Sequence, residues 1–145
     1  MDYFRLATPQ DIEALKHIDS VATAERAQNI QQWVNEKNCY LIERQSQIIA
    51  YGVLHYRFFG CGFIEMLMVD SEFRRQGIGS QLIEQLKLTC VTPKLFTSTN
   101  QSNVSMQRLL ANAQFIPSGI IENLNEGDPE LIYFCRWTPS TTEQT

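Results

Sequence analysis

The sequence predicts a single α/β domain of about seven strands and about four helices. Short runs rich in β-branched and aromatic residues alternate with segments whose apolar residues recur at helical spacing. Neither an internal repeat nor a linker interrupts this order. With 145 residues, of which 43% are hydrophobic and 19% charged, the chain is long enough to bury one sizeable core. We expect the domain to span residues 1–137, with a polar tail over residues 138–145.

The first half of the chain is expected to hold a strand, two helices and an antiparallel meander. Thr8 and Pro9 supply a hydroxyl cap and a proline at the first helical position, and Ile12, Leu15 and Ile18 form the apolar face that follows. A second helix is expected between residues 22 and 36. The expected strands cover residues 3–6, 39–44, 48–58 and 63–69, and residues 59–62 turn the chain between the last two.

The second half is expected to alternate between helix and strand before it ends in a hairpin. Its first helix carries apolar residues at helical spacing, namely Ile78, Leu82, Ile83, Leu86 and Cys90. Further along, we expect a strand over residues 95–99, a helix over residues 104–113, and a hairpin over residues 116–136 that turns at residues 125–129.

Residues 63–86 are the most informative stretch of the chain. A strand that is apolar except for Glu65, and short enough to be buried on both faces, precedes a polar turn and a helix that opens with Gly77 and Gly79. Glycines allow unusual backbone dihedrals and let a ligand approach without striking a Cβ. A helix N-terminus offers unpaired N–H groups and a partial positive charge, so with Arg74 and Arg75 this turn suits a phosphate or pyrophosphate.

Two other nucleotide-binding loops fit the spacing poorly. A P-loop needs Gly-Lys-Ser/Thr after its four-residue gap, and the chain contains no Gly-Lys dipeptide. A Rossmann turn needs a third glycine or an alanine where Leu82 stands. The remaining alternative is a glycine-rich helix start that binds nothing, which the two adjacent arginines make less favourable.

The segment Arg74-Arg75-Gln76-Gly77-Ile78-Gly79 resembles the R/Q-x-x-G-x-G/A acyl-CoA motif of the GNAT N-acyltransferase superfamily. The order of expected elements is similar to that of the family over residues 2–136. This resemblance implies a mixed, mostly antiparallel sheet opened at a coenzyme cleft, with acetyl-CoA as acyl donor. It also implies that residues of the strand, the loop and a later helix hold the coenzyme: Leu67, Met68, Val69, Arg74, Arg75, Gln76, Gly77, Ile78, Gly79, Ser80 and Asn103.

Glu65 is the candidate catalytic base. Strand alternation places it on one face with Phe63, where a carboxylate is costly unless it is hydrogen-bonded, paired or protonated. Such a carboxylate suits the removal of a proton from an attacking amine, and the resemblance implies the same role for a glutamate on this strand. The alternative is a structural partner across the hairpin, with Tyr56 opposite Glu65 in one register and Arg57 after a one-residue slip. His55 is a weaker candidate base.

The general acid is not identified by the sequence. Residues 103–115 resemble the family segment N-x-x-A-x-x-L-Y-x-x-x-G-F, but Leu110 stands where the family has its tyrosine and Gln114 replaces the glycine. Tyr133, Ser105 or water could instead protonate the leaving thiolate, or the chemistry could be slow or lost. Asn103 matches the family segment, which implies a contact with the coenzyme arm, and an ordinary helix cap is its other interpretation.

Charge limits the range of partners. A net charge of −4 and a pI near 5.1 argue against nucleic acid as the main partner. The chain has no basic residue between Arg108 and Arg136, and this stretch carries the acidic residues Glu122, Glu126, Asp128 and Glu130. If these side chains border the acceptor site, they favour a small amine or a polyamine; otherwise they form a solvated turn. A peptide or protein amine acceptor, a homodimer, and a non-catalytic acyl-CoA-binding or regulatory module are also compatible with the sequence.

The remaining compositional features predict a reducing, cytoplasmic setting. Four scattered cysteines form no C-x-x-C pair, so buried free thiols are expected, with neither a disulfide framework nor a metal site. The first residues lack the regions of a signal peptide, and no apolar run is long enough for a membrane span.

Overall fold

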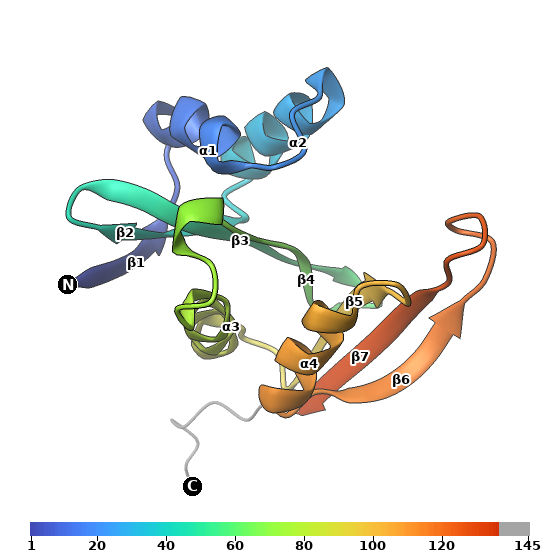
Figure 1. Cartoon of the computed structure of the whole chain (residues 1–145). Helices are drawn as coiled ribbons and strands as arrows, with labels where there is room; N and C mark the ends of the chain where they lie inside the picture. Colours follow the sequence, from blue (N-terminus) through green and yellow to red (C-terminus); the bar gives the residue numbers. More distant parts are fainter. Residues whose placement is uncertain (137–145) are drawn as a thin grey trace, which may run out of the picture. The chain divides into compact units, whose positions relative to one another are not determined.

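The computed structural model describes residues 1–136, and within them it contains seven strands, four α-helices and two short 3-10 turns (Figure 1). In chain order these are β1 (Asp2–Leu6), η1 (Pro9–Asp11), α1 (Ile12–Ile18), α2 (Ala24–Asn35), β2 (Cys39–Arg44), β3 (Gln47–Phe58), β4 (Cys61–Val69), η2 (Ser71–Phe73), α3 (Ile78–Thr89), β5 (Lys94–Asn100), α4 (Val104–Asn112), β6 (Ile116–Ile121) and β7 (Glu130–Arg136). The polar tail expected at residues 138–145 lies outside the described residues.

The strands hydrogen-bond in the order β1-β2-β3-β4-β5-β7-β6. β4 and β5 run parallel, whereas β1 with β2, β2 with β3, β5 with β7, and β6 with β7 are antiparallel. The prediction of a mixed, mostly antiparallel sheet of seven strands with four helices is therefore confirmed.

The chain forms two compact units that share β3 and β4. Among the described residues, the first unit comprises Met1–Leu54 and Met66–Leu86, and the second comprises His55–Glu65 and residues 87–136. The loop before α3 belongs to the first unit, and Glu65 belongs to the second. Among the described residues no helix is long and apolar enough to cross a membrane.

In the first unit, helices lie on both faces of the β1–β2–β3 meander (Figure 1). Successive strand residues point to opposite faces, so Leu41 and Tyr51 pack with Trp33 in the core that α1 and α2 cover. On the other face, Leu82 and Leu86 of α3 pack over the backbone of β3. Both faces of the meander are thus covered by helices. The packing of α3 against β3 fixes the position of the start of α3.

In the second unit, β5 and β7 have one buried and one partly open face. Leu95, Thr97 and Tyr133 are buried, whereas Phe96 and Phe134, which alternate with them, are only half-buried. The expectation that β4 is buried on both faces was wrong for the first half of the strand. There Phe63 is half-buried and Glu65 is exposed to solvent. A partly open sheet face is therefore available to a ligand beside Glu65.

Candidate active site

The predicted anion-binding loop joins β4 to α3 in the first unit. Asp70 Oδ1 accepts the N–H of Glu72 at 3.0 Å and so begins η2. Arg74 Nε donates to the carbonyl of Val69 at 3.0 Å, which folds the loop back onto the end of β4. Helical bonding starts where the N–H of Gln81 donates to the carbonyl of Gly77 at 3.0 Å. The loop is therefore anchored at both ends by hydrogen bonds of its own residues.

The turn of this loop leaves backbone donors for a ligand. Arg75 and Gly77 both have positive φ, 65° and 78°, so the chain bends sharply just before the helix. A Cβ placed on Gly77 would meet no atom within 4 Å, so the space beside this backbone is open. The first amides of α3 have no intrahelical acceptor, and the helix dipole adds partial positive charge there. This donor set, with the exposed Arg74 and Arg75, fits a pyrophosphate.

The other predicted coenzyme residues of this unit have divided roles. Met68 and Ile78 point into the core, so only their main chains could contact a ligand. Gln76 and Ser80 are exposed, and Leu67, Val69 and Gly79 are half-buried. The N–H of Asp70 donates to Ile49 of β3 at 2.8 Å, which holds the end of β4 in place.

Arg44 is a neighbour of the loop that sequence reasoning did not find. Its Nη1 lies 3.4 Å from Gln76 Oε1, and its guanidinium lies 5.8 Å from the centre of the Phe73 ring. Arg44 also forms a two-point ion pair with Asp2, at 2.8 and 2.9 Å, and this hydrogen bonding lowers the pKa of Asp2 to about 2. Asp2 in turn accepts from Gln81 of α3 at 3.1 Å. The strand pair β1–β2 therefore supports both ends of the loop.

Glu65, the candidate base, lies in the second unit and pairs with His55. Nε2 of His55 is 3.1 Å from Oε1 of Glu65, and the glutamate side chain is 41% exposed. Neither partner considered from the sequence, Tyr56 or Arg57, occupies this place, and the Tyr56 hydroxyl instead accepts the N–H of Val91.

The turn between β3 and β4 is also shorter than expected. Within residues 59–62 only Phe59 and Gly60 have positive φ, 54° and 75°, as in a two-residue hairpin turn that directly joins β3 to β4. The expected turn over residues 59–62 was therefore two residues too long. A shorter turn changes the register between β3 and β4, so neither of the two registers considered from the sequence holds.

The hydrogen bonds of His55 define its tautomer. Its Nδ1 accepts the N–H of Arg57 at 3.0 Å, so that nitrogen carries no proton and the ring proton is on Nε2. The imidazole therefore donates from Nε2 to Oε1 of Glu65. A carboxylate that is exposed and oriented by a buried donor is placed to accept a proton from a ligand.

The remaining predicted residues of the second unit have structural roles. Asn103 is the N-cap of α4, because its Oδ1 accepts the N–H of Met106 at 3.1 Å. The Ser105 hydroxyl donates to the same oxygen at 3.2 Å. Leu110 is fully buried, and Tyr133 is buried on β7. The helix-cap interpretation of Asn103 is thus confirmed, whereas its contact with a coenzyme remains a prediction.

Two acidic residues of the hairpin over residues 116–136 accept hydrogen bonds from neighbouring residues. Asp128 accepts from the N–H and hydroxyl of Ser102 at 3.0 and 2.6 Å. Glu130 accepts from the Ser98 hydroxyl at 2.6 Å and from Asn125 at 3.2 Å. Two of the four acidic residues therefore stabilise the loops of the second unit.

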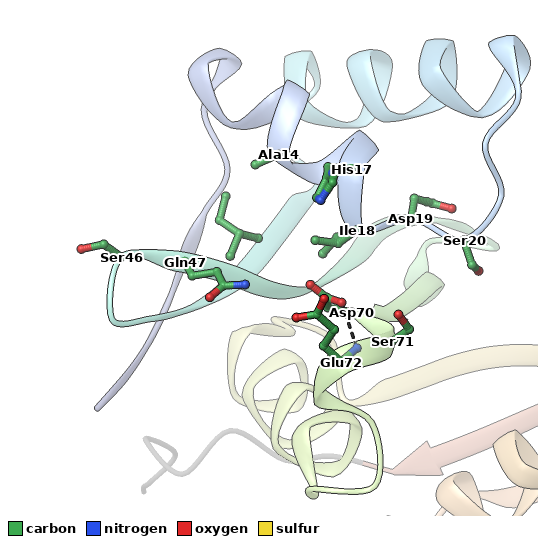
Figure 2. Close-up of a pocket in the computed structure, with 11 residues that line it drawn as sticks. Ala14, His17, Ile18, Asp19, Ser20, Ser46, Gln47, Asp70, Ser71 and Glu72 are labelled. Atoms are coloured by element: carbon green, nitrogen blue, oxygen red, sulfur yellow. Dashed lines mark hydrogen bonds between the residues drawn. The ribbon is translucent and has the colours of Figure 1, made fainter.

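A separate pocket of about 530 Å³ lies in the first unit between α1, the β2–β3 turn and the residues that follow β4 (Figure 2). Asp19, Asp70 and Glu72 are among the residues that line it. Asp19 is already bonded to the Tyr51 hydroxyl and to Arg26, and Asp70 caps η2. None of the predicted site residues lines this pocket, and it adds no chemistry to the loop.

The fold, with its glycine-containing turn between β4 and α3, is that of an acyl-CoA acyltransferase. Residues 6–114 match the profile of the acetyltransferase (GNAT) family, and the chain belongs to this family. No curated protein sequence matches the chain.

Several solved structures are similar to the chain. An acetyltransferase of the GNAT family from Bacillus cereus ATCC 10987 is 33% identical, with a TM-score of 0.89 over 95% of this chain and 99% of that one. The ribosomal-protein-S18-alanine N-acetyltransferase from Escherichia coli shares the fold at 16% identity, with a TM-score of 0.82 over 100% of both chains. A Bacillus anthracis str. Ames protein described as a streptothricin acetyltransferase, solved with acetyl coenzyme A, is 23% identical, with a TM-score of 0.66 over 74% of this chain and 68% of that one.

Proposed function

We propose that this acetyltransferase-family protein moves an acetyl group from acetyl-CoA to a small primary amine by direct attack in a ternary complex. The observation that carries the proposal is the carboxylate of Glu65, held 3.1 Å from a histidine donor on an open sheet face. The acetyl coenzyme A bound to the similar Bacillus anthracis protein supports the choice of donor.

The loop residues supply the coenzyme site in this proposal. Main-chain amides from Gly77 to Ser80 bind the pyrophosphate, and Arg74, Arg75 and Gln76 border it. The main chain of Leu67, Met68 and Val69 holds the pantetheine arm, and Asn103 contacts it from α4. Acetyl-CoA, when bound, supplies the thioester whose acetyl carbon is open to attack.

Glu65 removes the proton of the acceptor amine in this proposal. As the new C–N bond forms and the C–S bond breaks, the nitrogen loses a proton to the carboxylate. His55 donates to the other side of the same group and keeps it oriented. Because Leu110 has no hydroxyl, a water molecule supplies the proton that the leaving thiolate takes up. His55 is thus a positioning residue and Glu65 the catalytic one.

We further propose that the protein acts in the cytoplasm. All four cysteines of the chain are free thiols, and three of them are buried, as is typical of proteins from reducing compartments. A homodimer remains a prediction.

The test combines calorimetry with an assay of thiol release. Wild-type protein should bind desulfo-CoA and release thiol from acetyl-CoA when amines are added. Glu65→Gln should keep the coenzyme affinity and lose about a hundredfold or more in kcat. Glu122→Gln, an exposed acidic residue of the same unit, is the matched control and should behave as wild type. An unchanged kcat in Glu65→Gln would remove the base assignment.

Leu110 is the observation that favours a second candidate function, a non-catalytic acyl-CoA-binding or regulatory module. The same experiment separates the two functions. A binding module would take up desulfo-CoA and release no thiol with any amine.

A further inference from the structure

A row of aromatic rings lies on the open face of the second unit and starts beside the candidate base. The rings of His55 and Phe63 have centroids 5.5 Å apart, Phe63 and Phe58 are stacked at 4.8 Å, and Phe58 and Phe96 lie at 5.1 Å. None of these three phenylalanines is fully buried. An apolar surface therefore leads from the partner of Glu65 across three strands.

This row ends in an apolar pocket of about 630 Å³. Phe58, Phe96 and Ile132 form its wall, and Ile120 and Ile121 of the edge strand β6 form its rim. Cys61 also lines the pocket, and it stands four residues before Glu65 in β4, or about 13 Å along the strand. The carboxylate and the pocket are thus spaced for one small molecule with a charged end and an apolar end.

We propose that this pocket receives the apolar body of the acceptor, so that the substrate is a primary amine carrying an aryl or branched alkyl group. The ammonium lies at Glu65, and the aryl group stacks on Phe58 and Phe96. This inference rests on the proposed function, because it names the acceptor of the same site. Charge and apolar surface both contribute, the first to orientation and the second to affinity.

A polyamine fits the same surface less well. Its second ammonium would have to leave water among Phe58, Phe96 and Ile132, and Lys94, which also lines the pocket, would repel it. The acidic residues of the hairpin, Glu122, Glu126, Asp128 and Glu130, do not line this pocket, so none of them is placed to compensate the charge there. The pocket therefore selects against a second positive charge.

The test uses two substitutions on one strand. Ile120 lines the pocket and is 60% exposed, whereas Ile116 is 57% exposed and does not line it. Ile120→Asp places a charge in the pocket, and Ile116→Asp is the matched control. Binding of 4-phenylbutylamine and of spermidine is measured by calorimetry on wild type and both variants, and thiol release from acetyl-CoA is measured with the same two amines.

We expect wild type to prefer 4-phenylbutylamine to spermidine in both measurements. Ile120→Asp should lower the affinity for 4-phenylbutylamine at least tenfold and raise the affinity for spermidine. Ile116→Asp should leave the preference between the two amines unchanged. Tighter binding of spermidine to wild type, equal effects of both substitutions, or no binding of 4-phenylbutylamine would overturn the inference. Selective binding without thiol release from any amine would support the apolar amine site and reject the proposed activity.

Discussion

Nε2 of His55 lies 3.1 Å from Oε1 of Glu65, across the hairpin that joins β3 to β4. The other ring nitrogen accepts the N–H of Arg57, so the imidazole is neutral and its only proton points at the carboxylate. In residues 1–136 no second hydrogen-bond or ion-pair partner of Glu65 occurs. The carboxylate is thus oriented from one side and accessible from the other.

The pair predicts that replacing His55 has different effects according to the donor that remains. The side-chain amide of His55→Gln still donates to Glu65, whereas His55→Leu leaves the carboxylate without its donor. We expect kcat to fall about tenfold to a hundredfold in His55→Leu and to recover most of that loss in His55→Gln. Thiol-release kinetics measure kcat, and desulfo-CoA calorimetry checks that coenzyme affinity is retained. Equal kcat in both variants would argue against a positioning role.

The open backbone at Gly77 predicts a selective loss of coenzyme binding. Gly77→Asp places a Cβ and a negative charge where no protein atom lies within 4 Å, in a turn with φ of 78°. We expect desulfo-CoA affinity to fall at least tenfold, because the carboxylate repels a pyrophosphate. Calorimetry measures this change.

Gly60→Asp is the matched control for backbone strain. Gly60 has φ of 75° and equally open surroundings, but it lies in the β3–β4 turn. It should lose similar stability, about 1 kcal/mol or more, and keep its affinity for desulfo-CoA. Comparable losses of affinity in both variants would mean that strain, not the ligand site, is responsible.

The sequence predicts the fold and the loop because their signals are local. Periodicity over a few residues identifies each strand and helix, and Gly77 is required by a turn of its own segment. The pairing of His55 with Glu65 is not local, because it joins two strands across a turn in which Phe59 takes a φ of 54°, a conformation that phenylalanine rarely adopts. Arg44 is likewise hidden, because Gln76 is 32 residues away in the chain. Local patterns carry no information on such contacts.

Asp11 predicts a pH-dependent contribution to stability. Its carboxylate accepts from Arg5 at 2.9 and 3.0 Å and from the N–H of Thr8 at 2.7 Å. The hydrogen bonds from Arg5, followed by those from Thr8, hold the pKa of Asp11 below its usual range. A group with a lowered folded-state pKa stabilises the protein above its unfolded pKa, about 4, and this contribution is lost as pH falls through the folded value.

We therefore expect Asp11→Asn to lower the free energy of unfolding by about 2 kcal/mol at pH 7 and by progressively less below pH 4. Urea denaturation over a pH series measures both. Glu13→Gln removes a carboxylate that is 84% exposed and is paired with Lys16, so it should change stability by less than about 0.5 kcal/mol. A constant difference between wild type and Asp11→Asn down to pH 2 would contradict the linkage.

Cys61 predicts chemical access to the apolar pocket. It is half-buried and lines that pocket, whereas Cys39, Cys90 and Cys135 are buried, and burial raises the pKa of Cys39 to about 12. A thiol reagent at pH 8 should therefore label Cys61 first, and mass spectrometry of digested protein identifies the site. If the pocket binds an aryl amine, 4-phenylbutylamine should slow this labelling severalfold, and Ile120→Asp should abolish the protection.

Cys61→Ser is the control and should leave the native protein almost unlabelled. Labelling of the buried thiols at the same rate as Cys61 would show that the second unit opens readily.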